Sequence, residues 1–423
     1  MSASSRRTQT KMNLLYPIRR LPTLCENVGA KKSLHKTPSS WRRGFSVSCR
    51  KSSLQPEEAE AVGELRMRAW QTTGYDGVDG LLLGSVRVPP ILLPRDVLVR
   101  VQAASVNPID TAIINGYGGE VLNMMRTLGR LEQGILDDNQ MEFPLTAGRD
   151  FAGEVVSVGQ DVKSLAVSDR VFGVVSPQRQ GSHAEFVTTA ASNVCLMPNN
   201  INAEEAASVP YAALTAWSAV MVTGMLTPDA APRSKVLLLG ASGGVGTIIC
   251  QLLSSWGAQV VGLCSSDALD LVTSLGVEAL DYREPTTKDM LIAEGGFDLV
   301  INATGEDDLD YMKALKPWKG CSYITLSPPL LRNIDSMGLA AGLFKSARQV
   351  LCRNATSLSE GRAYKWAFYM PNPWALNQLA KMLASQRIRP VIDKIYPFTE
   401  APEAYRYVID GHARGKTVLS LSK

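Results

Sequence analysis

The chain has 423 residues, enough for about two domains at ~100–200 residues each, and 45% of them are hydrophobic. Residues 1–52 hold twelve Lys and Arg but one acid, Glu26, so their net charge is +11; since the whole chain is +4, residues 53–423 carry −7. This mildly acidic body argues against a nucleic-acid-binding surface.

The seven cysteines show no C-x-x-C spacing. This pattern argues against a disulfide framework or a zinc knuckle and predicts reduced, mostly buried thiols. No uninterrupted apolar run approaches the ~18 residues that a transmembrane helix needs. We therefore expect no transmembrane segment.

Residues 1–52 are rich in Arg, Lys and Ser, lack an apolar core and are almost free of acids. This composition is typical of a mitochondrial transit peptide, although a disordered basic tail would have the same composition. We favour import, with the matrix as the expected destination. Residues 53–65 are polar and acidic and are predicted to be a linker.

Residues 66–204 are predicted to form an all-β region, because short alternating runs are separated by proline and glycine clusters. Asn107-Pro108-Ile109-Asp110 is expected to end one of these strands in a turn. Residues 120–142 have helical apolar spacing, and a segment of this length between β elements favours a lid or pocket wall. Further strands are expected at 143–159, 169–172 and 182–187.

Residues 203–223 look helical, with Pro210 as a kink or break. Strand and helix patterns then alternate through residues 205–365, which predicts a parallel sheet with helices on both faces. The expected strands are 236–239, 259–264, 279–282, 297–302 and 321–326. A ligand of such a sheet lies along the carboxyl ends of the strands.

The stretch 236–246, VLLLGASGGVG, carries the strongest signal. An apolar strand leads into a glycine turn and then into a helix whose apolar residues share one face, and Gly257 is placed to cap that helix. Strand, glycine turn and helix N-terminus together form a phosphate site, where backbone N–H groups meet a pyrophosphate. A turn without a ligand is the alternative, but the flanking elements favour dinucleotide binding.

Residues 366–423 return to β character. A helix is expected at 374–385, and the segments 390–396 and 417–421 are expected to be strands that rejoin the first domain.

Several motifs occur in a characteristic order: Ser105-Val-Asn107-Pro108-Ile-Asp110, Gly148-Arg-Asp150, Asp169-Arg-Val171, Ala241–Gly246 and Gly411–Thr417. This order resembles the quinone oxidoreductase (zeta-crystallin-like) branch of the medium-chain dehydrogenase/reductase superfamily, over residues 66–423. Leu214–Ser218, the insert 120–142, Trp366–Phe368 and Arg389–Ile392 resemble, more narrowly, the mitochondrial reticulon-4-interacting protein family of NADPH oxidoreductases. The resemblance implies an α/β fold in which a Rossmann domain is inserted into a GroES-like β domain.

Zinc alcohol dehydrogenases of this fold look like Cys-Gly-Thr-Asp and Gly-His-Glu at two motifs where this chain has Asn107–Asp110 and Gly148–Asp150. Zinc needs thiolate, imidazole or carboxylate ligands. We therefore expect no metal, and hydride transfer to a quinone or a conjugated enone.

An NAD site usually has an acid about 20 residues beyond the glycines. Here that point is Cys264-Ser265-Ser266, and the first acid, Asp267, is interpreted as a helix N-cap. A serine favours a 2′-phosphate, so NADPH is preferred over NADH, with Arg283 as a further source of charge. Many quinone oxidoreductases have a lysine where this chain has Asp267–Asp270.

The resemblance also implies a set of cofactor residues. Ser242, Gly243, Gly244, Val245 and Gly246 would hold the pyrophosphate, Ser265 and Tyr282 the adenosine end, and Asn302, Ala303 and Leu326 would lie under the nicotinamide. Tyr369 and Met370 would contact the nicotinamide half, with core packing as an equal alternative. His412, Ala413 and Arg414 would close over the phosphates, and the planar fork of Arg414 suits a phosphate.

A proton must accompany the hydride. Tyr117 is the candidate donor by resemblance to enoyl reductases, and ring stacking, packing of the insert or protonation by solvent are the alternatives. Asn107 is a candidate hydrogen-bond donor to a substrate oxygen, or a turn residue fixed by Pro108.

The leading hypothesis is a mitochondrial, NADPH-dependent, zinc-free reductase of quinones or quinone-like enones, linked by resemblance to ubiquinone biosynthesis. An enoyl-thioester reductase of the same fold and an NADPH-binding scaffold with little turnover are the alternatives. The resemblance also implies protein partners, either reticulon-type proteins or ubiquinone-synthesis enzymes, and a homodimer, although the sequence itself does not settle the oligomeric state.

Overall fold

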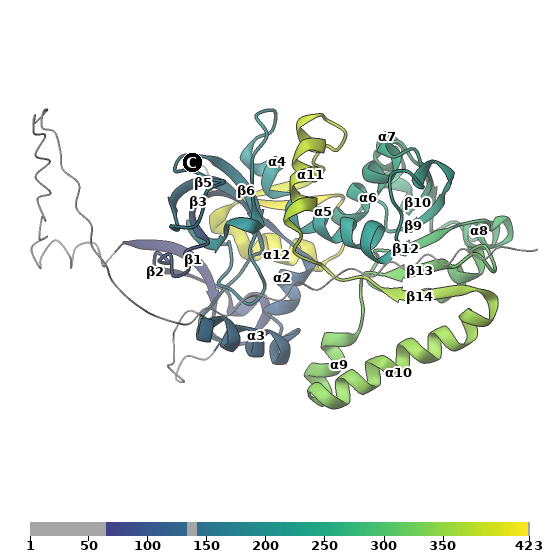
Figure 1. The fold of residues 1–423 in the computed structure, drawn as a ribbon, viewed down its shortest axis with the longest axis horizontal. Helices are drawn as coiled ribbons and strands as arrows, with labels where there is room; N and C mark the ends of the chain where they lie inside the picture. The colour runs from purple at the N-terminus through teal and green to yellow at the C-terminus, as the bar shows by residue number, and fades with distance from the viewer. Residues whose placement is uncertain (1–64, 133–141, 422–423) are drawn as a thin grey trace, which may run out of the picture. The chain divides into compact units, whose positions relative to one another are not determined.

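The computed structural model describes residues 65–132 and 142–421, so the predicted transit peptide and most of the linker lie outside the described residues. Three sheets organise this part of the chain (Figure 1). Their strands all lie in one compact unit, which spans Glu57–Lys423.

The largest sheet has the order β15-β16-β3-β5-β6-β8, and β7 also pairs with β3. Its strands are antiparallel to their neighbours except for the parallel pair β15–β16. They are β3 Asp96–Val106, β5 Asp150–Val158, β6 Arg170–Val174, β7 Phe186–Ala190, β8 Val194–Leu196, β15 Ile392–Pro397 and β16 Lys416–Ser420. The strand predicted at 182–187 starts too early, because β7 begins only at Phe186. Among residues 182–185, Ala184 pairs with Ala69 in an isolated bridge.

A small antiparallel sheet, β2-β1-β4, lies beside the largest one. Its strands are β1 Arg66–Thr72, β2 Leu82–Arg87 and β4 Leu145–Thr146. The helical segments between β1 and β4 are η1 Gly77–Gly80, α2 Pro108–Ile113 and α3 Gly119–Glu132. The expected turn at Asn107–Asp110 is a helix instead, since Asn107 is the N-cap of α2, in a reciprocal capping box with Asp110, and Pro108 occupies the first turn.

The third sheet is entirely parallel, in the order β11-β10-β9-β12-β13-β14. Its strands are β9 Lys235–Leu239, β10 Gln259–Cys264, β11 Glu278–Asp281, β12 Leu299–Asn302, β13 Cys321–Thr325 and β14 Arg362–Trp366. Strand β9 is buried on both faces: Val236 and Leu238 join one hydrophobic cluster, whereas Leu237 and Leu239 join another. This explains its uninterrupted apolar run, and the expected α/β architecture is confirmed.

The remaining helical segments connect the strands of the two large sheets. They are η2 Ala191–Asn193, α4 Ala203–Ala207, α5 Pro210–Trp217, η3 Ser218–Thr223, η4 Ala231–Arg233, α6 Gly244–Ser255, η5 Ser266–Ala268, α7 Leu269–Ser274, α8 Thr287–Glu294, η6 Leu309–Ala314, α9 Leu330–Met337, α10 Leu339–Ser357, η7 Leu358–Glu360, α11 Pro373–Ala384, η8 Phe398–Glu400 and α12 Ala401–Ile409. The pair α9–α10 and the strand β14 had no predicted counterpart.

By length and composition alone, the segment Ala203–Thr223 could cross a membrane. However, 78% of its most apolar 18-residue stretch is buried inside the structure. The segment is also interrupted, because α5 begins at Pro210 and ends in a π-helical turn. It contributes Ala213, Leu214 and Trp217 to the hydrophobic cluster that α6 also joins. We interpret the segment as a core helix.

Candidate functional site

The glycine turn joins β9 to α6 at the carboxyl edge of the parallel sheet. Gly240 has a φ of +81°, where only glycine is unstrained. A Cβ on Gly246 would lie 2.1 Å from the carbonyl oxygen of Gly240, so a side chain cannot be added without moving the backbone. The twelve-residue helix α6 begins directly after this turn. The first N–H groups of a helix have no partners within the helix, so they are free to bind a ligand.

The loop before β16 covers this turn. Gly415 pairs with Gly243 in a parallel bridge, and the Gly415 N–H donates to the Ser242 carbonyl oxygen over 2.9 Å. The side chain of Arg414 forms an ion pair with Asp267, whose carboxylate also accepts from the Ser265 hydroxyl. The fold therefore brings Arg414 to the end of β10, beside Ser265. Asp267 is not an N-cap, since Ser265 holds that position before η5.

The other predicted cofactor residues lie along the same edge or close to it. Ala303 and Leu326 directly follow β12 and β13, and the Leu326 N–H donates to the Asn302 carbonyl oxygen. The Asn302 amide is buried and engaged with Tyr323, Thr304 and the Glu306 backbone, so it shapes the strand end.

The remaining predicted residues differ in exposure. Tyr282 is 54% exposed beyond β11, where Arg283 lies over its ring. Tyr369 stacks on Tyr211 with ring centroids 4.4 Å apart, while Met370 is exposed. Val245 and Ala413 are half-buried, and His412 is exposed.

A buried polar network lies behind the glycine turn. Asp150, which is fully buried, accepts hydrogen bonds from the Ser105 hydroxyl at 2.6 Å, the Asn107 side-chain amide at 2.8 Å and the Tyr211 N–H at 2.7 Å. Lys416 donates to the side-chain oxygen of Asn107 and lies 3.5 Å from the Asp150 carboxylate. Burial lowers the pKa of Lys416, whereas Asp150 opposes that shift.

Lys416 also connects this network to the turn, because a Cβ on Gly244 would lie 2.7 Å from its Cδ. Its stem therefore packs on the turn while its ammonium group holds Asn107. Both ends of the Asn107 side chain are engaged with protein groups, which fits a positioning role better than direct contact with substrate.

A second buried set adjoins the first. The guanidinium of Arg149 lies 3.7 Å from the Asp110 carboxylate, and burial raises the pKa of Asp110 to about 6. His183 lies between the Tyr405 hydroxyl and the Ser105 carbonyl oxygen, and burial lowers its pKa to about 4. His183 is therefore neutral in this site at physiological pH.

Tyr117 lies in the turn between α2 and α3. The carboxylate of Asp335 in α9 accepts from the Gly118 N–H at 2.6 Å, which fixes this turn against the parallel-sheet half. Burial raises the pKa of Tyr117, so its phenol stays protonated at neutral pH. A protonated phenol could donate a proton, but protonation alone does not identify Tyr117 as the donor.

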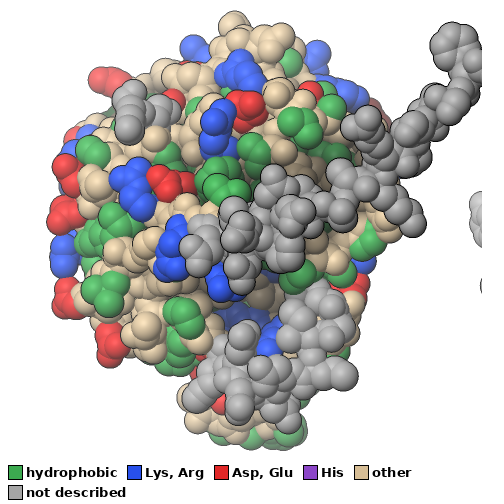
Figure 2. Space-filling view, turned by 90° about the vertical axis from the view of Figure 1, so that its left-hand side faces the viewer, with side chains coloured by type: hydrophobic (Ala, Val, Ile, Leu, Met, Phe, Trp, Pro, Cys, Tyr) green, Lys and Arg blue, Asp and Glu red, His purple; other side chains and the backbone are tan. Residues whose placement is uncertain are grey.

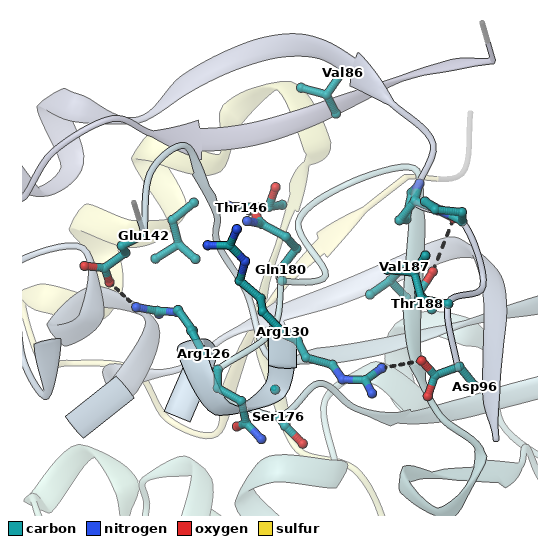
Figure 3. Close-up of a pocket in the computed structure, with 18 of the residues that line it drawn as sticks. Val86, Asp96, Arg126, Arg130, Glu142, Thr146, Ser176, Gln180, Val187 and Thr188 are labelled. Carbon is teal, nitrogen blue, oxygen red and sulfur yellow. Dashed lines mark hydrogen bonds and ion pairs between the residues drawn. The ribbon is translucent and has the colours of Figure 1, made fainter. Parts of the chain in front are cut away.

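A separate cavity of about 900 Å³ lies between α3 and strands β1, β2 and β7 (Figure 3). Ion pairs Arg126–Glu142 and Arg179–Asp96 line it, the second at 2.9 Å. None of the residues predicted for the cofactor lines it. On the face nearest this region, acidic and basic side chains are interspersed with hydrophobic ones (Figure 2).

The sequence prediction missed the roles of Lys416, Arg149 and Asp150. Arg149 and Asp150 are adjacent charged residues between Gly148 and Phe151, and Lys416 lies between Gly415 and Thr417. Charge in such a context is costly unless it is paired, and this was the signal available. Four cysteines, Cys195, Cys250, Cys264 and Cys321, are buried and unbridged, as expected, while Cys352 is exposed.

Comparison with known proteins identifies this arrangement. Residues 93–222 match the alcohol dehydrogenase GroES-like domain, and residues 275–419 match the zinc-binding dehydrogenase family. The chain is 38% identical to the zebrafish (Danio rerio) NAD(P)H oxidoreductase RTN4IP1, mitochondrial, over 90% of this chain and 94% of the relative. The chain belongs to the RTN4IP1 family of NAD(P)H oxidoreductases.

Two further relatives in the RTN4IP1 family are similar. The human protein of the same name is 39% identical over 84% of this chain and 89% of its own. A Caenorhabditis elegans relative, named reticulon-4-interacting protein 1, mitochondrial, is 34% identical over 84% of this chain and 94% of its own. The expected family and the expected oxidoreductase class are confirmed.

The fold is also shared with a quinone oxidoreductase from Coxiella burnetii. That structure superposes with a TM-score of 0.67 at 24% identity, over 84% of this chain and all of the other. The expected combination of a GroES-like domain and a Rossmann-type sheet is confirmed.

One of the two family descriptions that this chain matches is a zinc-binding dehydrogenase, which raises the question whether zinc fits this site. Among residues 65–132 and 142–421, no group of three or more His, Cys, Asp or Glu is placed to hold a metal. The positions compared with zinc motifs carry the amide of Asn107 and the guanidinium of Arg149, and the ammonium of Lys416 adjoins them. Cationic side chains repel a metal ion, so these residues do not fit a zinc centre.

Proposed function

We propose that this protein is a mitochondrial, NADPH-dependent reductase of quinones or quinone-like enones that works without zinc. The observation that carries the proposal is the buried Lys416–Asn107–Asp150 network directly behind the glycine turn. In this network the Lys416 ammonium holds Asn107, the position at which the corresponding motif of zinc alcohol dehydrogenases resembles Cys-Gly-Thr-Asp. A conjugated acceptor suits such a site, because a proton at its oxygen suffices in place of a Lewis acid.

The glycine turn and the loop before β16 would hold the dinucleotide. The N-terminus of α6 would receive the pyrophosphate through Gly244, Val245 and Gly246, with Ser242 beside them. Bound NADPH would supply a hydride to the conjugated acceptor. This chain would position the acceptor and exclude water, and either Tyr117 or solvent would deliver the proton to the acceptor oxygen.

The preference for a 2′-phosphate rests on Arg414 and Ser265. Arg414 offers a planar fork at the end of β10, where it already pairs with an anionic group, the Asp267 carboxylate. A 2′-phosphate would compete with Asp267 for Arg414. NADPH should therefore bind better than NADH, but by less than it would without Asp267.

Residues 1–52 are proposed to be a transit peptide, with the matrix as the destination. The names of the relatives, which place those proteins in mitochondria, support this. The name of the nematode relative supports a reticulon-type partner. The link to ubiquinone synthesis and the homodimer remain proposals from the sequence resemblance.

The test combines binding with turnover. NADPH and NADH are titrated by fluorescence, and oxidation of NADPH is then followed with a short-chain ubiquinone analogue and with an aliphatic enone. We expect tighter binding of NADPH and turnover of at least one acceptor. Tight binding of NADPH without turnover of either acceptor would overturn the reductase proposal and favour a scaffold.

The Tyr117→Phe variant separates the proton sources. If Tyr117 protonates the acceptor, enone turnover falls by about 100-fold or more, whereas quinone turnover changes little because a reduced quinone is protonated readily by solvent. An enone turnover that falls no more than the quinone turnover, relative to the parent protein, would exclude Tyr117 as the donor.

A further inference from the structure

The long helix α10 is packed against the protein by its polar side. The Asn333 side-chain amide in α9 donates to the Ser346 hydroxyl at 3.0 Å and to the Gln349 side-chain oxygen at 2.9 Å. Asn354 accepts from the Tyr364 N–H and donates to the Tyr364 carbonyl oxygen in β14, both at 2.9 Å. The hydrogen-bonding residues of α10 therefore face inward.

The opposite side of α10 is apolar and exposed to solvent. Its residues recur every three or four positions, which places them on one face of a helix: Ala340, Phe344, Ala347, Leu351 and Ala355. Phe344 is 74% exposed and Leu351 is 69% exposed, and Leu343 widens the face on one side. We call this surface the α10 stripe.

This arrangement is the reverse of that of an ordinary surface helix, which buries its apolar side and exposes its polar side. In Figure 1, α10 runs below β14, with α9 as its labelled neighbour. Burying apolar side chains such as Phe344 and Leu351 is worth about 1.5–3 kcal/mol each. Covering the stripe with an apolar surface would therefore be favourable.

The exposed charged side chains of α9 and α10 are all basic. Lys345 and Arg348 are exposed on the flank of α10, and Arg332 is exposed on α9. From Ser336 to Ser359 the chain contains no Asp or Glu. A partner that covers the stripe must therefore accept cations at its edge.

A second copy of the chain fits this requirement poorly. A twofold interface presents the same patch on both subunits, so Lys345 and Arg348 would face cations of the partner copy without acids to compensate. An anionic lipid surface fits both properties, because acyl chains accept Phe344 and Leu351 while headgroups pair with the flanking cations. Helices of this kind lie in the plane of the membrane interface.

We propose that the α10 stripe docks the protein on an anionic membrane surface. This inference goes beyond the oxidoreductase activity and does not depend on which acceptor is reduced. Its consequence is that an apolar acceptor dissolved in the bilayer would reach an enzyme already held at the surface.

The test places an environment-sensitive NBD fluorophore on Cys352, which is exposed on α10. The full chain is used with Cys25→Ser and Cys49→Ser, so that the label enters α10 alone; the other cysteines are buried. Vesicles of phosphatidylcholine, with and without phosphatidylglycerol, are added. Residues 1–52 have a net charge of +11, so we expect them to attract anionic vesicles as well, and the readout is the emission of the probe and not pelleting.

We expect a blue shift with anionic vesicles and little shift with neutral ones. The variant Phe344→Glu/Leu351→Glu should weaken this response by at least about tenfold in lipid concentration, or ~1.4 kcal/mol. The matched control is Leu82→Glu/Leu196→Glu, which adds the same charge at exposed apolar positions on β2 and β8 and should respond like the parent. Thermal melts check that each variant folds.

Three results would overturn the proposal. The parent protein could show no blue shift with anionic vesicles. The shift could be equal with neutral vesicles, which would remove the role of charge. Sedimentation could instead reveal a dimer that Phe344→Glu/Leu351→Glu dissociates, without a lipid response, which would assign the stripe to a second copy.

Discussion

The glycine turn and the buried network behind it are neighbours built in opposite ways. The turn consists of backbone from one short segment, Gly240–Gly246, and works because side chains are missing. The network consists of charged side chains, and the Asn107–Lys416 hydrogen bond joins residues 309 positions apart. Adding atoms to such a turn should distort it and weaken ligand binding. Removing one partner from a buried charge network should instead lower the stability of the fold.

The largest effect is expected from adding one methyl group to the turn. Gly246→Ala places a Cβ against the Gly240 carbonyl oxygen and should weaken NADPH binding by about 100-fold, or ~3 kcal/mol, in a fluorescence titration. Gly243→Ala is the matched control, because its Cβ would lie at an ordinary 3.6 Å from the same oxygen. Equal losses in the two variants would show that the shape of the turn does not limit binding.

Removing a charge should reveal the network. Lys416→Met keeps most of the stem on Gly244 but leaves the buried Asp150 without its counter-charge, which should cost about 3 kcal/mol of unfolding free energy. Asp150→Asn should be similarly destabilising, and urea unfolding measures both. The double variant should lose less than the two single losses combined; strictly additive losses would mean that Lys416 and Asp150 do not interact.

The pH dependence of stability should differ between two variants of the same buried region. Because the pKa of His183 falls from 6.5 to about 4 on folding, the unfolded chain binds more protons, and stability drops by about 2 kcal/mol between pH 6.5 and 5. Asp110 acts in the opposite direction, since its pKa rises from 3.8 to about 6; stability gains about 1 kcal/mol between pH 6 and 5.

Urea unfolding at about pH 7.5 and 5 separates these two contributions. Relative to the parent, His183→Gln should gain stability as the pH falls, and Asp110→Asn should lose it. Parallel pH profiles for the parent and both variants would refute the assignment.

The smallest effect concerns the exposed ion pair over the turn. Asp267→Asn releases Arg414 and removes a carboxylate that would repel a 2′-phosphate, so NADPH affinity should rise about threefold with little change for NADH. The measured quantity is the dissociation constant of NADH divided by that of NADPH. Arg414→Met should lower this ratio. An unchanged ratio in both variants would place the 2′-phosphate elsewhere.

The sequence made the turn and the parallel sheet predictable because their signals are local. The apolar run 236–239 and the glycines that follow it are contiguous, and the strand is buried on both faces. The network was not predictable, because Asn107, Asp150 and Lys416 meet only through the pairing of β3 with β5 and β16. Helix α10 was also missed, since its apolar residues face outward and a search for core faces passes over them.

The pairing of β16 with β3 has a consequence for how the protein is made. All six strands of the parallel sheet precede β16 in the chain, since the last of them, β14, ends at Trp366, so that sheet can form before β16 is available. The other large sheet waits for β16, Lys416–Ser420. Domains fold as units during synthesis, so we expect the nascent chain to carry a finished cofactor half beside an open, aggregation-prone β half until β16 emerges.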